Sequence, residues 1–399
     1  MFQKFQTLMG ERRALVESGV DPFRVVIDRI LSPTEAIVNG RRTLLVGTNN
    51  YLGLTFDPEC VEAACAAARE EGTGTTGSRM ANGTYAGHVA LERELAEYFG
   101  KRTAIVFSTG FLANIGMLSA LAGPGDTVLI DADCHASIYD GCRLCGAEIL
   151  RFKHNDPASL AKRLERLGDR ARTTLVVVEG IYSMLGDRAP LAEIAEIKAR
   201  HGALLMVDEA HSLGVLGRRG RGLAEEAGVE AEVDFVVGTF SKSLGAIGGY
   251  CASDHPELEA IRYASRPYIF TASPSPSVIA STRTALRILE TRRELGSRLW
   301  ENARRLYGGL QAMGYRVGPE PSPIVAVRFD SREQVLALWK GLLDQGIYVN
   351  LVLPPAAPGG GALLRCSVSA AHTPEQIDRV LEAFRALGGA AATPPAEAE

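Results

Sequence analysis

The sequence has no apolar stretch of the roughly 18 residues that a membrane-spanning helix requires. Residues 1–13 carry charged and polar side chains where a signal peptide would have its apolar core. The seven cysteines are an odd number without a repeating spacing, which favours a reducing compartment over a disulfide framework. A formal net charge of -4 offers no basic surface to nucleic acid. We therefore expect a cytoplasmic protein with small-molecule partners and no integral membrane segment, and peripheral contact at the inner membrane stays open.

Closely spaced metal ligands are also scarce. Cys142 and Cys145 form the only close cysteine pair, and neither a second pair nor a suitably spaced histidine accompanies them. A zinc or redox site built on such a pair needs that further partner. We therefore interpret the pair as a chance spacing and expect no metal.

What the chain does contain is an ordinary globular composition, with 46% hydrophobic and 23% charged residues over 399 positions. From about residue 86 onward, short apolar runs alternate with helical patterns, which predicts a mostly parallel sheet covered on both faces. We therefore predict the α/β class, with a large domain at residues 46–275 and a smaller α+β domain at residues 276–388.

The two ends of the chain have a different character. Residues 1–45 predict a helical arm of the kind that packs on a partner subunit, and residues 389–399 predict a disordered tail. The charged segment 277–313 predicts one long helical stretch at the start of the smaller domain.

The stretch from Gly238 to Gly245 places Lys242 between hydroxyl residues and glycines, directly after the apolar run 235–237. The run predicts a buried strand, the glycines allow a ligand to approach closely, and Thr239 and Ser241 offer hydroxyls to an anion. These features indicate a lysine that forms an imine beside a phosphate. A nucleotide-binding loop is the alternative, although the G-x-x-x-x-G-K-[ST] spacing is absent.

Asp208 ends the apolar run 203–207, and His211 follows it closely. A carboxylate at the end of a buried strand needs a cation or several donors as partners. The protonated ring nitrogen of a cofactor is one candidate partner, and an arginine or His211 itself is the other. The same D-E-A-H motif occurs in nucleotide-dependent helicases, but no Walker A loop precedes it here.

Three further positions leave alternatives open. His135 could stack on a planar ring or be a structural histidine with satisfied hydrogen bonds. The segment Ser108-Thr109-Gly110 could bind an anion at a helix start or simply cap that helix. Arg365, in an apolar context, could bind a carboxylate of a substrate or of the protein.

Two loops are equally ambiguous. The glycine and hydroxyl loop 72–79 is either a flexible connector or a ligand-facing loop. The basic loop 217–222 either contacts a phosphorylated acyl carrier or is a solvated turn.

The polar residues of interest share one position relative to the predicted strands. In parallel sheets, ligands bind beyond the carboxyl ends of the strands. Each of these residues comes just after an apolar run and is therefore expected at such a strand end. The residues are Ser108, His135, Glu179, Asp208 and Lys242. Together with Arg365 they are the parts needed to hold pyridoxal phosphate (PLP) and an amino acid.

The ordered motifs of the chain resemble the α-oxoamine synthases, which are PLP enzymes of fold type I, over nearly its whole length. The motifs that carry this resemblance are Asn50-Tyr51-Leu52-Gly53, Gly110-Phe111-x-Ala113-Asn114, Asp133-x-His135-Ala136-Ser137, Glu179-Gly180-x-Tyr182-Ser183-Met184, Asp208-Glu209-Ala210-His211-Ser212 and Thr239-Phe240-Ser241-Lys242-Ser243. Within the family, the Ser-Lys-Ser sequence, the loop 74–83 and the segments 183–187 and 266–273 are most similar to the bacterial serine palmitoyltransferase branch.

The resemblance implies a role for each catalytic position. Lys242 would form the internal aldimine with PLP and later move the Cα proton. Asp208 would pair with the ring nitrogen and His211 with the ring oxygen, while His135 would stack on the ring and help to hold the substrate carboxylate. The residues expected around the phosphate are Gly110, Phe111, Thr239 and Ser241.

The resemblance also implies partners. Thr271 would reach the cofactor phosphate of the neighbouring subunit, which makes a homodimer the expected working unit. Arg365 and Asn50 would bind the substrate, with Arg365 on its carboxylate. Phe111 stands where the serine palmitoyltransferases have a tyrosine, so one hydroxyl contact is lost while the ring packing is kept.

The implied reaction is the decarboxylating condensation of L-serine with a long-chain acyl thioester such as palmitoyl-CoA, giving 3-ketodihydrosphingosine in the first step of sphingolipid synthesis. The acyl carrier, coenzyme A or acyl carrier protein, and the chain length stay open. Arg79, Met80 and the glycine loop before them are expected on the acyl-facing side. The alternatives are a sister enzyme that uses glycine or alanine, and a catalytically idle scaffold subunit.

Overall fold

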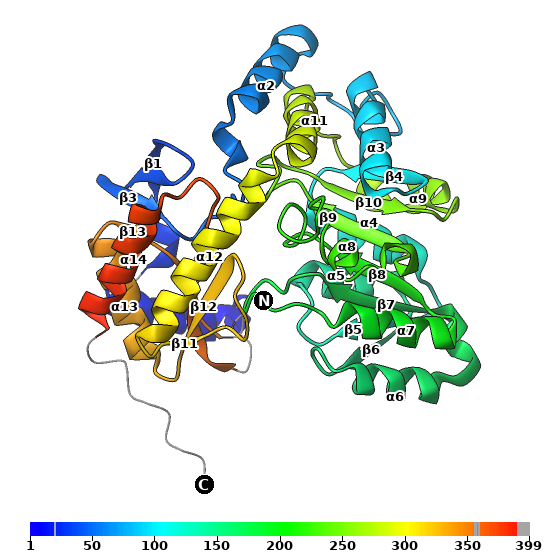
Figure 1. Cartoon of the computed structure of the whole chain (residues 1–399). Helices are drawn as coiled ribbons and strands as arrows, with labels where there is room; N and C mark the ends of the chain where they lie inside the picture. The colour runs from blue at the N-terminus through cyan, green and yellow to red at the C-terminus, as the bar shows by residue number, and fades with distance from the viewer. Residues whose placement is uncertain (20, 355–356, 358–359, 389–399) are drawn as a thin grey trace. The chain divides into compact units, whose positions relative to one another are not determined.

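The computed structural model describes residues 1–19, 21–354, 357 and 360–388 (Figure 1). The tail predicted at residues 389–399 lies outside these described residues. Contacts between Cα atoms divide the chain into two compact units, residues 49–299 and the combination of residues 1–48 with the segment from residue 300 onward. Within the described residues, no helix has both the length and the apolarity that crossing a membrane would require.

The unit at residues 49–299 is built on a seven-stranded sheet with the strand order β4-β10-β9-β8-β7-β5-β6. All strands run in one direction except β10, which is antiparallel to both of its neighbours. The strands are β4 (Thr103–Phe107), β5 (Thr127–Asp131), β6 (Glu148–Phe152), β7 (Thr174–Glu179), β8 (Leu204–Asp208), β9 (Phe235–Thr239) and β10 (Gly249–Ser253). The predicted α/β class with a mostly parallel sheet is confirmed.

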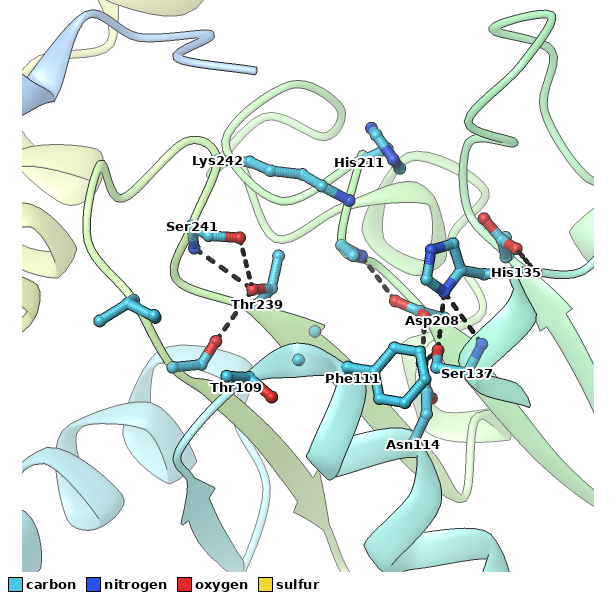
Figure 2. A pocket seen from close by; sticks show the side chains of 16 residues that line it. Thr109, Phe111, Asn114, His135, Ser137, Asp208, His211, Thr239, Ser241 and Lys242 are labelled. Atoms are coloured by element: carbon cyan, nitrogen blue, oxygen red, sulfur yellow. Dashed lines mark hydrogen bonds between the residues drawn. The ribbon is translucent and has the colours of Figure 1, made fainter. Parts of the chain in front are cut away.

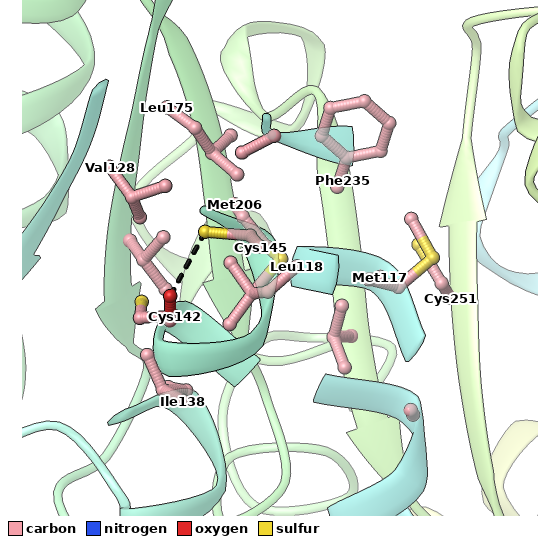
Figure 3. Packing of buried hydrophobic residues seen from close by; sticks show 14 of the residues in the cluster. Met117, Leu118, Val128, Ile138, Cys142, Cys145, Leu175, Met206, Phe235 and Cys251 are labelled. Carbon is pink, nitrogen blue, oxygen red and sulfur yellow. Dashed lines mark hydrogen bonds between the residues drawn. The ribbon is translucent and has the colours of Figure 1, made fainter. Parts of the chain in front are cut away.

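Helices cover both faces of this sheet, as the continuous apolar strands require. The helices of this unit are α2 (Pro58–Glu71), α3 (Ala86–Phe99), α4 (Gly110–Leu121), α5 (Ala136–Cys145), α6 (Pro157–Leu167), α7 (Leu191–His201), α8 (Leu223–Glu226), α9 (Leu258–Ala264), α10 (Arg266–Ile269) and α11 (Pro276–Thr291), of which α2 packs on α11. Figure 3 shows Met117 and Leu118 of α4 packed with Ile138 and Cys142 of α5 over strands of the sheet. This rigid core fixes the loops at the strand ends.

The pair Cys142 and Cys145 belongs to that core. Both thiols are buried on α5, and the Cys145 Sγ donates a hydrogen bond to the Cys142 carbonyl oxygen at 3.0 Å (Figure 3). Burial raises the pKa of Cys142 to about 12, so the thiol stays protonated at neutral pH. Among the described residues, no group of three or more His, Cys, Asp or Glu side chains could hold a metal ion.

The other unit contains two four-stranded sheets, with the orders β1-β2-β3-β13 and β11-β12-β15-β14. The strands are β1 (Ile27–Ile30), β2 (Glu35–Val38), β3 (Arg41–Leu45), β11 (Arg316–Val317), β12 (Ile324–Phe329), β13 (Ile347–Tyr348), β14 (Asn350–Val352) and β15 (Ala362–Ser367). Its helices include α1 (Gln6–Glu17), α13 (Arg332–Asp344) and α14 (Pro374–Leu387). Strand β13 pairs with β3, so the N-terminal strands and the C-terminal region fold as one body.

The long helical stretch expected at residues 277–313 is formed by two helices. Helix α11 ends at Thr291 and α12 (Glu294–Ala312) begins three residues later. Arg292 leaves the helical region, with φ -114° and ψ 66°, and its Nη1 donates to the Asp57 carboxylate at 2.6 Å. Asp57 caps α2, so this ion pair fixes the break, and packing on α2 and α3 places α11 in the unit that begins at residue 49.

Candidate active site

Strands that run in the same direction bring polar residues to one edge of the seven-stranded sheet. Thr109 follows β4, His135 follows β5, Glu179 and Asp208 end β7 and β8, and Thr239 ends β9. A cavity of about 290 Å³ opens at this edge, and Figure 2 shows Lys242, His211, Asp208 and His135 directed toward the same space. The structure therefore brings His135, Asp208 and Lys242, which the sequence places just after strands, to one cavity.

Lys242 lies in a turn that hydrogen bonds hold in place on both sides. The Thr239 hydroxyl donates to the Gly248 carbonyl oxygen at 2.9 Å and lies 2.9 Å from the Ser241 hydroxyl. The Ser243 hydroxyl donates to the Leu213 carbonyl oxygen at 2.5 Å. The half-buried Lys242 side chain therefore projects from a rigid backbone into the cavity.

Asp208 is a buried carboxylate, 4% exposed, whose two oxygens are held by neutral donors. Its Oδ2 accepts a hydrogen bond from the Asn114 Nδ2 at 2.7 Å, and its Oδ1 accepts one from the Ala210 N–H at 2.9 Å. These bonds aim the carboxylate without neutralising it. A buried carboxylate that lines a cavity suits a cationic ligand atom.

His135 is oriented by a chain of hydrogen bonds that starts at the same asparagine. The Asn114 Nδ2 donates to the Ser137 hydroxyl at 3.0 Å, and this hydroxyl lies 2.7 Å from the His135 Nδ1, which also accepts from the Ser137 N–H at 3.2 Å. The Nδ1 is therefore an acceptor, and Nε2 carries the ring proton. Burial lowers the pKa of His135, as does Lys242, while Asp208 opposes both, so the ring is neutral at pH 7.

His211 has a partner that the sequence analysis missed. The Tyr51 hydroxyl, in a side chain that is 0% exposed, lies 2.7 Å from the His211 Nδ1. Because Tyr51 fixes Nδ1, the orientation of the imidazole is set before any ligand binds. Nothing in the local pattern connects two residues 160 positions apart, although Tyr51 belongs to a motif that carried the family resemblance.

Glu179 lies at a strand end, as predicted, but its hydrogen-bond partner was not anticipated. It lines the cavity beside Asp208, and its Oε1 accepts a hydrogen bond from the His135 N–H. Burial raises the pKa of Glu179 well above its ordinary range and Asp208 adds to this, while Lys242 and the His135 N–H lower it. Glu179 therefore anchors the backbone of His135.

One end of the cavity is suited to an anion. Helix α4 begins here, with the Thr109 hydroxyl accepting from the Leu112 N–H at 3.1 Å, and the hydroxyls of Thr239 and Ser241 lie nearby. A Cβ at Gly110 would lie 2.6 Å from the Thr239 Cβ, so only glycine lets the helix start approach β9 this closely. Phe111, 42% exposed, meets the His135 ring edge to face at a centroid distance of 6.3 Å.

The expectation that Arg79 faces an acyl chain is wrong. Arg79 is 8% exposed, and its Nη1 and Nη2 bind the two oxygens of the buried Glu92 at 2.8 and 3.1 Å. The loop before it is held by Ser273, whose N–H donates to the Gly77 carbonyl oxygen at 3.0 Å. The loop is therefore a structural connection between α3 and the segment after α10, although Met80 is exposed.

Three predicted site residues are missing from the described residues that line the cavity, namely Asn50, Thr271 and Arg365. Asn50 is 8% exposed and donates to the Thr55 hydroxyl at 2.8 Å, while its Oδ1 has no hydrogen-bond partner among the described residues. Thr271 follows α10, and Arg365 is buried on β15 in the other unit. Their roles stay predictions.

Comparison with known proteins places the chain in a known family. The model of the family "aminotransferase class I and II" matches residues 41–384. The serine palmitoyltransferase of Caulobacter vibrioides is 57% identical over 390 residues, covering 98% of this chain and 96% of the relative. The 8-amino-7-oxononanoate synthase of Exiguobacterium sibiricum is 40% identical, covering 96% and 98%. A solved structure of "SPT with PLP internal aldimine" is similar with a TM-score of 0.95 and 52% identity, covering 97% of this chain and 98% of that one.

Proposed function

Because the chain belongs to the class I and II aminotransferase family, we propose that it is a PLP-dependent acyltransferase that condenses L-serine with a long-chain acyl thioester. The products are CO2, the free thiol carrier and the long-chain amino ketone 3-ketodihydrosphingosine, so the reaction begins sphingolipid synthesis. The observation that carries the proposal is one cavity lined by Lys242, Asp208, His135 and His211 with an anion site at its end.

The described residues fit PLP. Asp208 is a buried carboxylate aimed into the cavity by neutral donors, which suits the protonated ring nitrogen. The start of α4 at Gly110, with the hydroxyls of Thr239 and Ser241, suits the phosphate. Lys242 supplies an amine that can bond covalently with an aldehyde.

When bound, PLP supplies an electron sink that stabilises negative charge at the Cα of an amino acid. The side chains of the protein would bind and orient the cofactor and move the proton. Asp208 would keep the ring nitrogen protonated, His211 would bind the ring oxygen, and the neutral His135 ring would provide a flat surface against the cofactor and a donor at Nε2. Lys242 removes the proton from the serine Cα, since its amine projects from a fixed turn into the same cavity.

The substrates require further residues. We propose that Arg365 and Asn50 bind the serine portion, with Arg365 on the carboxylate that leaves as CO2, and that Phe111 packs beside the cofactor. The buried Asn50 Oδ1, which has no hydrogen-bond partner within the described part of the chain, is an acceptor available to such a ligand. We also propose a homodimer in which Thr271 reaches the phosphate of the partner's cofactor, working in the cytoplasm.

The second candidate function is that of a sister enzyme that uses alanine or glycine. The 40% identity with an 8-amino-7-oxononanoate synthase over almost the whole chain favours this alternative over unrelated chemistries. The higher identity with a serine palmitoyltransferase, 57%, favours L-serine. A catalytically idle scaffold has no physical need for Lys242 in the cavity, so it is the weakest alternative.

The cofactor assignment is tested by absorbance and by mass. The purified protein should be yellow, and borohydride reduction should attach PLP permanently to the peptide that contains Lys242. Lys242→Ala should still bind PLP but gain no mass after reduction. A colourless protein that binds no PLP, or a Lys242→Ala variant with full turnover, would contradict the proposal. Titration of the visible band with L-serine, L-alanine and glycine then ranks the substrates.

A further inference from the structure

An ionic cluster of one half-buried histidine and two buried aspartates lies outside the residues that line the cavity. His154 follows β6, Asp131 ends β5, and Asp187 belongs to the loop after β7. Strand β5 lies between β7 and β6 in the sheet, so the three residues come from the carboxyl ends of three adjacent strands. The central strand of the three leads directly into His135.

The geometry of the cluster defines its charge. The His154 Nδ1 lies 2.8 Å from the Asp131 Oδ1, and its Nε2 lies 2.7 Å from the Asp187 Oδ2. Carboxylate oxygens only accept, so both ring nitrogens donate and the ring is an imidazolium. Burial alone would lower the pKa of His154, but the bonds to Asp131 and Asp187 raise it to about 10. Asp133, 4.0 Å from Nε2, adds a third negative charge.

The same carboxylates organise the two loops on either side. Asp131 accepts from the Asp133 N–H at 2.8 Å and from the Asn155 N–H at 2.9 Å. The Asp187 carboxylate accepts a hydrogen bond from the Asn155 Nδ2 at 2.9 Å. The carbonyl oxygen of Asp187 accepts one from the Tyr182 N–H, which closes the turn before Asp187. The Tyr182 ring packs edge to face on the His154 ring at a centroid distance of 4.5 Å. His154 is therefore the cation that joins both loops.

Both loops are connected to the backbone of His135. Residues 131–134 lead directly into His135, and the other loop continues from Glu179, which binds the His135 N–H. We propose that His154 is a positioning residue, which clamps Asp131 and Asp187 together and so fixes the placement of the His135 ring against the cofactor. This inference rests on the proposed function, and it assigns to His154 no contact with substrate or cofactor.

A matched variant separates positioning from plain stability. His255 also donates to a carboxylate, with its Nε2 2.8 Å from the Asp234 Oδ1, and it lies at the amino end of β9, away from the cavity. His154→Gln and His255→Gln each replace a histidine that donates to a carboxylate by a neutral amide. Three measurements compare them with the parent protein: the NMR signals of the His135 ring without cofactor, the circular dichroism of the visible band with PLP, and the kcat and KM for L-serine.

The expected result is that His154→Gln shifts the His135 ring signals, alters the visible circular dichroism and lowers kcat/KM for L-serine by about tenfold, because a small misplacement is costly in catalysis. His255→Gln should match the parent in all three. If His154→Gln also matches the parent, the inference is overturned. Should His154→Gln fail to fold, Asp187→Asn, which keeps the acceptor and removes the charge, is judged by the same criteria.

The two proposals fail in different ways. A parent protein without a visible PLP band contradicts the proposed function, while the NMR comparison without cofactor still tests the link from His154 to His135. A parent protein with the band, combined with unchanged His135 signals and circular dichroism in His154→Gln, contradicts only the inference.

Discussion

Glu209, the residue after Asp208, makes a measurable prediction about stability and pH. Its side chain is 0% exposed, and it accepts hydrogen bonds from the Ser212 hydroxyl and from the N–H groups of Leu223 and Ala224, both at 2.9 Å. Burial raises the pKa of Glu209 from its ordinary 4.5 to about 7, although these three donors lower it. Burial therefore outweighs the donors.

The sign of the effect follows from proton binding. Between pH 4.5 and about 7 the folded protein holds a proton on Glu209 that the unfolded chain has released, so stability is lost as the pH rises through this window. A pKa difference of one unit corresponds to about 1.4 kcal/mol, so the free energy of unfolding should fall by about 3 kcal/mol across this pH window. Above pH 7 the loss should stop.

Glu209→Gln isolates this contribution, because glutamine has the same shape and does not titrate. Urea unfolding of both proteins without cofactor, between pH 4.5 and 8, gives the difference in free energy of unfolding at each pH. The wild type should lose about 3 kcal/mol relative to Glu209→Gln between pH 4.5 and 7 and then stay level. A difference that is flat would show that the three donors balance burial, and one that grows in favour of the wild type as the pH rises would show that they outweigh it; either result would refute the reasoning.

Two further substitutions test contacts that the sequence did not reveal. Tyr51→Phe removes the hydroxyl that contacts the His211 Nδ1, so the free energy of unfolding should fall by about 1–3 kcal/mol. PLP should also bind more weakly in equilibrium dialysis. An unchanged PLP affinity would contradict a role of Tyr51 in orienting His211. Arg79→Met removes one of the two arginines that bind the buried Glu92, since the Arg262 Nη1 also donates to its Oε1 at 2.9 Å, and should cost about 2 kcal/mol in urea unfolding. Arg69→Met at an exposed ion pair should change stability by less than about 0.5 kcal/mol, and equal effects of the two substitutions would contradict the importance of burial.

The strand-end residues could be predicted because the signal for them is local. A run of apolar residues such as 203–207 forms a buried strand, and the first polar residue after it must lie at the strand end, whatever the rest of the chain does. Asp208 and Lys242 were found in this way, and both line the cavity. The family resemblance then assigned roles that spacing alone left open.

The partners of those residues could not be predicted, because they depend on contacts between distant segments. Tyr51 meets His211, and Glu179 holds the backbone of His135, only after the sheet has formed. The break after Thr291 has the same origin, since an arginine in a helical pattern gives no sign that it will leave the helix to bind Asp57. Local propensity yields to such tertiary contacts.

The condensation reaction itself is the most direct test of the central claim. The purified protein, saturated with PLP, is incubated with palmitoyl-CoA and L-serine that carries an isotopic label in its carboxyl carbon. Our account predicts the release of labelled CO2 together with a long-chain amino ketone in equal amounts, and neither product from Lys242→Ala. No CO2 or ketone from L-serine, with turnover of glycine or L-alanine in its place, would contradict the assignment to L-serine.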